Sequence, residues 1–243
     1  PLVMLWVPES LDFLLTRRSA DTLPKVNRLL ARMKRPPMAA LPSQAEVAPS
    51  GNRILELFGP ALRTPTLLIW SCFFLTMSSL YFAQTWTPKI MVDAGYDLSQ
   101  GVSAGVLIQV GALAGIFALG ILTAKLTVQV TAALLMAFGC AAMVFFSQAI
   151  ADPAWLMPVA VCVGLGVNAS VVALYAIIPE VYPPRVRSTA TGWAIGAGRM
   201  SAVLAPVIAG YLLGAGVDLS TLYLLFGLPM AVAVACVLPA RSR

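Results

Sequence analysis

Residues 102–124 read VSAGVLIQVGALAGIFALGILTA, an apolar run without a single charged side chain. A helix needs about 20 predominantly apolar residues to cross the hydrocarbon core of a bilayer, and this run is long enough. Hydrocarbon offers no hydrogen-bonding partner to the backbone, so a single span of this kind forms an α-helix. The run therefore predicts a transmembrane helix.

Five further runs of the same kind occur along the chain, separated by polar or Gly- and Pro-bearing breaks. We therefore predict an all-α membrane protein whose six-helix transmembrane bundle occupies residues 66–238. The predicted spans are 66–88, 102–124, 130–150, 155–178, 189–214 and 221–238.

The composition fits a chain that is largely solvated by lipid. Hydrophobic residues make up 59% of the 243 residues and charged residues only 11%, whereas soluble domains are about 25% charged. The net charge of +6 would indicate nucleic acid in a polar chain. Here nearly all basic residues lie outside the apolar runs, so we expect a lipid bilayer and no nucleic acid as partner.

Enzyme chemistry finds little support. The chain has no histidine, and its four cysteines lie singly inside apolar runs without metal-ligand spacing. Metal sites and Ser-His or Cys-His nucleophiles need such residues. We expect no catalytic residue, no metal and no cofactor.

Basic and acidic connections alternate along the chain. The positive-inside rule places the basic connections in the cytoplasm, together with residues 8–65 and the tail 239–243. The basic connections carry Lys125, Arg185, Arg187, Arg241 and Arg243, and the acidic ones carry Asp93, Asp97, Asp152 and Asp218.

The N-terminal part precedes the predicted bundle. Residues 1–7 are apolar but too short to span, and they lack the flanks of a signal peptide. We interpret them as the end of a transmembrane helix that begins before this sequence, which makes the chain a fragment. Residues 8–65 form a cytoplasmic loop, with either a basic amphipathic helix on the inner leaflet or a plain linker. The apolar positions at helical spacing are Leu23, Val26, Leu29, Leu30 and Met33.

One charged residue lies deep inside a predicted span. Arg199 is ten residues beyond Thr189, which is about 15 Å along a helix and near the midplane of a ~30 Å core. A charge there costs about 2.5 kcal/mol or more, so it needs a polar interior, an anion or a partner. Gly192 and Gly196 precede it on the same face and leave room. We interpret Arg199 as a substrate- or gate-binding residue; the alternative is an ion pair with a carboxylate elsewhere in the bundle.

Further polar and aromatic side chains lie in the first, second and fourth spans. Each could simply join helices through interhelical hydrogen bonds. As a set they predict one polar lumen with aromatic walls. The candidate substrate-binding residues besides Arg199 are Tyr81, Gln84, Trp86, Gln109, Asn168 and Tyr175.

Residues 179–187 predict a tight cytoplasmic turn. Glu180 could pair with Arg187 and close the cytoplasmic face, which makes these residues and Arg185 candidates for gating. Alternatively, the arginines only set the topology. No Asp, Glu or His lies in the middle of a predicted span, so a proton-carrying carboxylate would lie outside this sequence.

Several stretches resemble major facilitator transporters. Residues 8–14, PESLDFL, are similar to the signature that follows the sixth helix of many members. Residues 179–193, PEVYPPRVRSTATGW, resemble the loop before helix eleven, and Gly198-Arg199, Leu204-Ala205-Pro206 and Gly210 resemble that helix. With residues 86–89, WTPK, and Ala94-Gly95, the pattern is most similar to the aromatic acid:proton symporters, from the end of helix six to helix twelve.

The resemblance implies proton-coupled uptake of aromatic or related organic carboxylates across a bacterial inner membrane, around a midplane site between two six-helix halves. It implies transport roles for Arg199 and Arg187, with Arg199 binding a carboxylate bidentately. The implied partners are a small organic anion, protons and an N-terminal half, without which the chain is not expected to transport.

Two departures from the family and several alternatives stay open. The family's Asp-Gly-Phe-Asp motif of the first helix is absent from this sequence, and Ala124 stands where an aspartate usually follows helix eight. Other facilitator substrates such as sugars, an inactive truncated product, and a membrane scaffold or enzyme are the alternatives. Residues 238–241, LPAR, differ from the Pro-Glu-Thr motif of sugar porters, which favours an acid.

Overall fold

The computed structural model describes residues 21–41, 53–150 and 152–240. The described residues form α-helices and no strand. They belong to two compact units, residues 1–51 and 52–243. The residues predicted to end a preceding helix, 1–7, and the final residues of the tail, 241–243, lie outside the described ranges.

In the first unit, α3 spans Thr22–Arg32. Lys25, Arg28 and Arg32 are exposed, and their spacing places them on one face of the helix. Beyond α3 the chain folds back, because the Asn27 side chain donates to the Met38 carbonyl at 3.1 Å and accepts from its N–H at 2.8 Å. A contact of α3 with lipid stays a prediction.

The second unit begins with the short helix α4, Arg53–Leu57, and continues with six long helices. In the described part of the chain, these six are long and apolar enough to cross a membrane. The prediction of an all-α, six-helix bundle is therefore confirmed. The helices are α5 (Arg63–Asp93), α6 (Leu98–Thr123), α7 (Val128–Ala149), α8 (Pro153–Val181), α9 (Pro184–Gly214) and α10 (Leu219–Val237).

Several helices run further than the predicted spans. The span predicted to end at Pro88 continues to Asp93. Within this added turn, Lys89 and Asp93 form an ion pair of 2.7 Å. Such charged turns lie beyond the apolar run, so a rule based on hydropathy stops before them. α9 likewise starts at Pro184, a residue type that suits the first turn of a helix.

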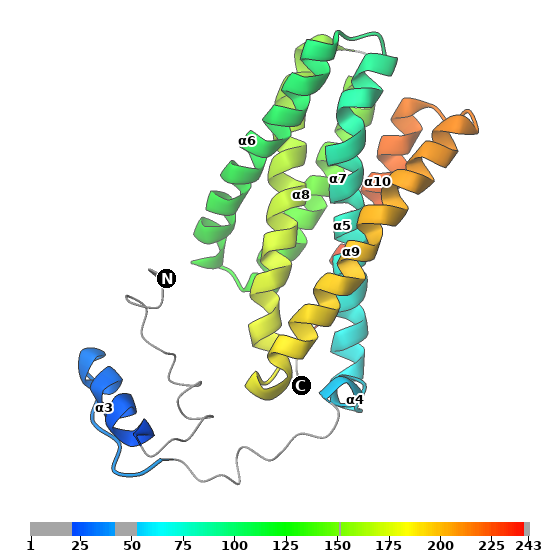
Figure 1. The fold of residues 1–243 in the computed structure, drawn as a ribbon. Coiled ribbons are helices and arrows are strands. Elements are labelled where there is room, and N and C mark those ends of the chain that lie inside the picture. Colours follow the sequence, from blue (N-terminus) through cyan, green and yellow to red (C-terminus); the bar gives the residue numbers. More distant parts are fainter. Residues whose placement is uncertain (1–20, 42–52, 151, 241–243) are drawn as a thin grey trace. The chain divides into compact units, whose positions relative to one another are not determined.

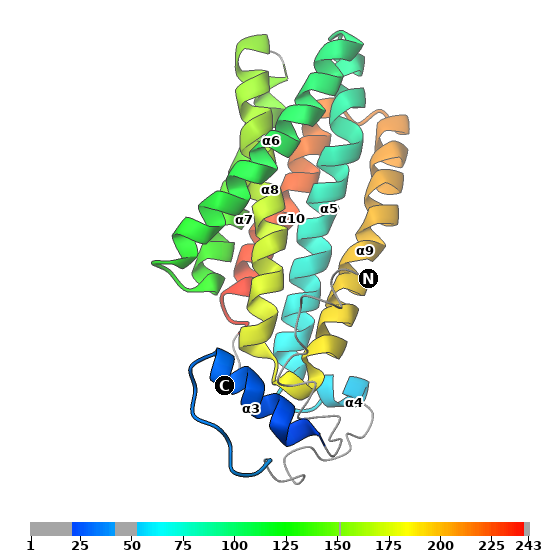
Figure 2. The same cartoon turned by 60° about the vertical axis from the view of Figure 1, so that its left-hand side comes forward.

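The helices pack in two groups that share contacts. α8 packs against α6 and α7, while α5 packs against α9 and α10; contacts of α10 with α7 and of α5 with α6 and α8 join the groups (Figure 1 and Figure 2). Glycines allow the closest approaches. A Cβ atom on Gly164 would lie 1.9 Å from the Ile108 carbonyl oxygen, and one on Gly111 would lie 2.0 Å from the Val161 carbonyl oxygen.

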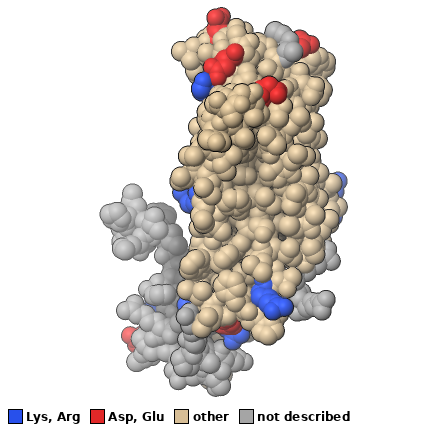
Figure 3. Space-filling view, turned by 90° about the vertical axis from the view of Figure 1, so that its right-hand side faces the viewer, with Lys and Arg blue, Asp and Glu red and all other residues tan. Residues whose placement is uncertain are grey.

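The two ends of the bundle differ in charge, and the visible face between them is largely uncharged (Figure 3). Three of the aspartates are the N-cap residues of α6, α8 and α10, where a negative charge complements the helix dipole. The acidic end is defined by Asp93, Asp97, Asp152 and Asp218, and the basic end by Lys125, Arg185 and Arg187.

Candidate functional site

Three carboxamide side chains from three helices meet in the bundle. Nε2 of Gln84 on α5 lies 3.4 Å from Oε1 of Gln109 on α6 and 3.5 Å from Oδ1 of Asn168 on α8. Asn168 also donates to the Gly164 carbonyl at 3.2 Å. We call Gln84, Gln109 and Asn168 the amide triad. The structure thus brings together three residues that the sequence predicted to line one polar lumen.

The amide triad keeps much of its hydrogen-bonding capacity open. Each primary amide has two N–H donors and a carbonyl oxygen with two lone pairs. Contacts of 3.4 and 3.5 Å are at the outer limit of a hydrogen bond, and Gln84 and Gln109 are exposed. Open amides facing hydrocarbon would be costly. The triad therefore fits a water-containing space or a polar ligand.

Aromatic side chains lie nearer the basic end on α5 and α8, two of the three helices that carry the amide triad. Tyr175 is seven residues beyond Asn168 on α8 and 37% exposed. Its ring centroid lies 5.3 Å from that of Phe73 on α5, in an edge-on arrangement. Tyr81, one turn before Gln84 on α5, is partly buried against the core. These rings can hold a flat apolar group beside the amides.

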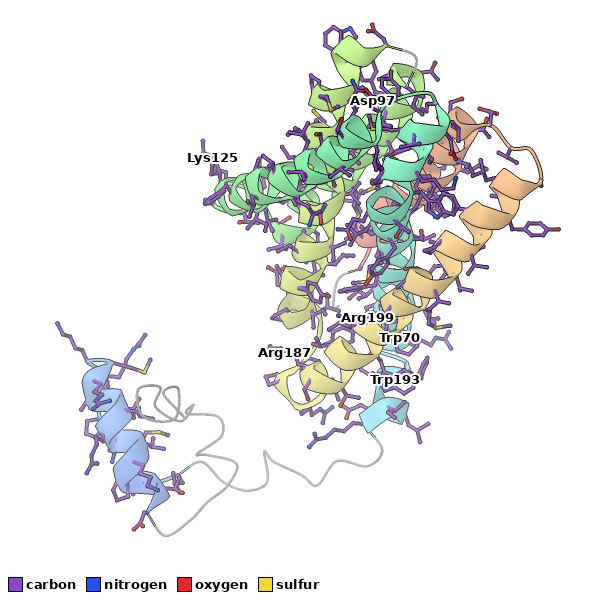
Figure 4. All side chains as sticks on the ribbon, turned by 45° about the horizontal axis from the view of Figure 1, so that its top comes forward. Trp70, Asp97, Lys125, Arg187, Trp193 and Arg199 are labelled. Carbon is purple, nitrogen blue, oxygen red and sulfur yellow. The ribbon has the colours of Figure 1, made fainter. Side chains whose placement is uncertain are left out.

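Arg199 lies midway along α9, between Trp193 and the acidic end of that helix (Figure 4). The neighbouring Gly198 packs against α5, because an added Cβ would lie 2.5 Å from Met77 Sδ and 3.3 Å from Phe73 Cβ. Since Phe73 also contacts Tyr175, Arg199 sits at nearly the same height in the bundle as Tyr175.

The Arg199 side chain is exposed. Among the described residues, none forms an ion pair with it. A Cβ atom added to Gly192 or Gly196 would meet nothing within 4 Å. The face of α9 that carries Arg199 is therefore open, and the alternative of an ion pair within the bundle finds no partner in the described part of the chain.

Arg199 and the amide triad lie at two heights in the bundle. Gln84 follows Met77 by seven residues, and Asn168 precedes Tyr175 by seven residues. Seven residues are two helical turns, about 10 Å along the axis. The guanidinium level and the amide level are therefore separated by roughly 10 Å.

Trp86 lies apart from the amide triad. It follows Gln84 by two positions, which turns it about 200° around α5. Its ring faces α9, where a Cβ on Gly210 would lie 3.3 Å from the ring. The indole N–H is buried and has no hydrogen-bond partner among the described residues. Helix rotation thus separates two candidates that are close in sequence.

At the basic end, the pairing of Glu180 with Arg187 suggested by the sequence is not present. Glu180 accepts a hydrogen bond of 2.7 Å from Nε2 of Gln129 on α7. Arg187 instead donates to the Pro179 carbonyl at 3.1 Å. Because α8 packs against α7, the hydrogen-bond partner of Glu180 is Gln129, a residue distant in sequence, rather than Arg187.

Arg185 forms an ion pair with Glu56 of α4. Tyr182 donates from its hydroxyl to Thr66 Oγ1 at 3.1 Å, and Thr66 donates to the Leu57 carbonyl at 3.2 Å. Burial raises the pKa of Tyr182 above its usual value. These contacts connect α4, α5 and the α8–α9 turn. The sequence analysis did not identify Glu56 or Gln129, because Glu56 is only one of five acids in the basic segment 8–65 and nothing in the sequence distinguishes it from the others.

Within the described ranges there is no group of three or more His, Cys, Asp or Glu side chains that could hold a metal ion. The groups available for ligands are therefore a guanidinium, three amides and aromatic rings. Such a set can bind an organic anion and its polar substituents, and it offers no nucleophile with an adjacent base.

The chain is similar to known membrane transporters. The model of the Major Facilitator Superfamily matches residues 127–243. The chain is 30% identical over 216 residues to the 3-(3-hydroxy-phenyl)propionate transporter of Escherichia coli, covering 89% of this chain and 46% of that protein. It is 28% identical over 224 residues to the benzoate transport protein of Acinetobacter baylyi, with coverage of 88% and 47%.

A third relative is the 4-hydroxybenzoate transporter PcaK of Pseudomonas aeruginosa, 26% identical over 238 residues, with coverage of 96% of this chain and 52% of that protein. The chain spans about half the length of these curated relatives. With the six apolar helices, these matches show a multi-pass membrane protein. The chain belongs to the Major Facilitator Superfamily.

Proposed function

We propose that this chain is part of a secondary active transporter that carries aromatic or related organic carboxylates, together with protons, across a bacterial inner membrane. The observation that carries the proposal is Arg199: an exposed guanidinium in an apolar helix, without an ion-pair partner among the described residues. A charge at this depth is costly unless an anion or a polar space compensates it. A substrate carboxylate supplies that anion in a bidentate geometry.

The substrate class is supported by the relatives. Those named above carry hydroxyphenylpropionate, benzoate and 4-hydroxybenzoate, all aromatic acids. In the proposed site, Arg199 binds the carboxylate while Tyr175 and Tyr81 lie along the ring. Part of the resemblance to the aromatic acid:proton symporters lies on α5 and α9, the helices that carry Tyr81 and Arg199.

The contacts at the basic end are proposed to hold that end closed in one state of transport. Three short contacts there involve the candidate gating residues: Gln129 with Glu180, Arg185 with Glu56, and Arg187 with the Pro179 carbonyl. All three lie within this six-helix unit, so they break only if opening moves α4, α7, α8 and α9 relative to one another at this end. By the positive-inside rule this end is cytoplasmic, and so is the C-terminus.

A second six-helix half is proposed as the partner of the open face. Large apolar side chains are exposed on α6 and α9, among them Phe117, Ile121, Val203 and Tyr211. A half of this kind would complete the site from the other side. Since the middle of α5–α10 holds no carboxylate, the proton carrier is assigned to that half.

A neutral polyol or sugar is the second candidate substrate, and the amide triad favours it, because amides bind hydroxyl groups well. Such a substrate has no carboxylate for Arg199 to bind. The two candidates therefore differ in what Arg199 contributes.

Uptake tests the proposal directly. The chain is joined to the N-terminal six-helix half of one of these relatives and expressed in bacteria, and uptake of labelled 4-hydroxybenzoate is followed with and without a proton uncoupler. Arg199→Ala and Arg199→Lys are compared at matched membrane abundance. Uncoupler-sensitive uptake that is lost in Arg199→Ala supports the proposal. Uptake that is unchanged in Arg199→Ala contradicts the role of Arg199, and absence of uptake of any aromatic acid contradicts the substrate class.

A further inference from the structure

We propose that the amide triad recognises a phenolic hydroxyl, or an equivalent hydrogen-bonding substituent, on the ring of the substrate. The proposal rests on the proposed function, because it takes the substrate carboxylate to be bound at Arg199. In this proposal, Gln84, Gln109 and Asn168 determine which aromatic acid is preferred. Arg199 binds the carboxylate that all of these acids share and so does not distinguish between them.

The chemistry of the triad matches a hydroxyl group better than a second carboxylate. A hydroxyl donates one hydrogen bond and accepts up to two, and a primary amide offers both donors and acceptors. A carboxylate only accepts, and it gains most from a cation. Since the three contacting side chains of the triad are uncharged, they favour a neutral polar substituent.

The spacing of the site matches a substituted ring. The guanidinium level and the amide level are about 10 Å apart along the bundle. Tyr175 lies at the guanidinium level and Tyr81 lies on α5 between the two levels, and Arg199 and the two glutamines are long enough to reach toward a ligand placed between them. A benzene ring with a carboxylate at one end and a hydroxyl at the other bridges them.

The geometry also separates the triad from a purely structural contact. At the basic end, Gln129 is only 7% exposed and bonds Glu180 at 2.7 Å, as expected for a contact that joins two helices. In the triad, two of the three amides are exposed and their contacts are 3.4 and 3.5 Å long. Loose contacts between exposed amides leave donors and acceptors for a ligand.

The test measures selectivity rather than transport. The full chain, joined to the same N-terminal half, is purified in lipid nanodiscs, and the affinities for benzoate and 4-hydroxybenzoate are measured by calorimetry. The variants are Gln84→Met, Gln109→Met and Asn168→Leu, which keep the approximate side-chain volume. Gln148→Met is the matched control, because Gln148 lies on α7, where its amide contacts Ser147. Arg199→Ala reports on the carboxylate.

The expected result is a loss of about three- to tenfold in affinity for 4-hydroxybenzoate in each triad variant, the effect of one neutral hydrogen bond. Affinity for benzoate stays within about twofold, as does the control. An unchanged ratio of the two affinities, or an equal loss for both ligands, overturns the role of the triad. If neither ligand binds the unmodified protein, or if Arg199→Ala binds both normally, the proposed function itself fails.

Discussion

Gln129 of α7 donates a 2.7 Å hydrogen bond to Glu180 at the end of α8, and Gln129 is almost fully buried. This contact joins residues 51 positions apart and engages the carboxylate that the sequence suggested as one possible partner of Arg187. At the basic end, α7 and α8 are therefore joined by a hydrogen bond from a neutral amide to a carboxylate. Arg187 is left to bond the carbonyl of Pro179.

Replacing Gln129 with leucine is expected to destabilise the bundle by about 1–2 kcal/mol. This is near the lower end of the range for a hydrogen bond to a charged group, because Glu180 is exposed. Unfolding in sodium dodecyl sulfate, followed by circular dichroism, measures the change. Glu180→Gln keeps an acceptor in place and should cost less. Equal stability of Gln129→Leu and the unmodified chain would contradict the contact.

Gly164 holds α6 and α8 at close distance, since a Cβ there would lie 1.9 Å from the Ile108 carbonyl oxygen. Gly164→Ala is therefore expected to destabilise the bundle by about 1–3 kcal/mol or more, as overpacking does. The matched control is Gly192→Ala, where an added Cβ meets nothing within 4 Å. The same unfolding assay should show Gly192→Ala unchanged or slightly stabilised. Two equally stable variants would rule out this close packing.

Asp218 caps α10, and hydrogen bonds from Ser220 and Thr221 lower its pKa below the usual 3.8. A carboxylate with a lowered pKa in the folded state stabilises that state above the unfolded pKa, and the contribution is lost as the pH falls through the folded pKa. The difference in thermal midpoint between the unmodified chain and Asp218→Ala should therefore be full at pH 7 and shrink below about pH 4. A difference that grows in acid would contradict the cap.

The ion pair between Arg185 and Glu56 is solvent-exposed on the arginine side, whose side chain is 70% exposed against 26% for Glu56. Exposed pairs contribute about 0–1 kcal/mol and are screened by salt. A double-mutant cycle with Arg185→Gln and Glu56→Gln should give a coupling free energy in that range at low salt and less at high salt. Coupling well above it would show that the pair is more buried than its exposure indicates.

The orientation of the bundle can be measured with reporter fusions. Alkaline phosphatase is active outside the cytoplasm, so a fusion after Lys125 should be inactive and one after Asp152 should be active. Matched fusions of a fluorescent protein should show the opposite pattern. Activity after Lys125 would reverse the assigned topology.

Residue order alone was sufficient for the features that depend on local composition. The six spans follow from the length of the apolar runs, because a bilayer sets the length of a helix whatever its neighbours are. The depth of Arg199 follows in the same way, from its count of residues beyond Thr189. The family resemblance also rests on short stretches of sequence, and the superfamily match confirms it.

Partnerships between helices depended on the fold. Gln84 and Trp86 are two positions apart, yet one meets Gln109 and Asn168 and the other faces Gly210. Which side chains meet depends on the rotation and tilt of each helix, and close contacts such as that of Gly164 with Ile108 set both. Hydropathy along a single helix carries little of that information, because almost every face of a membrane helix is apolar. The amide triad and the partner of Glu180 therefore emerged only when the helices were packed together.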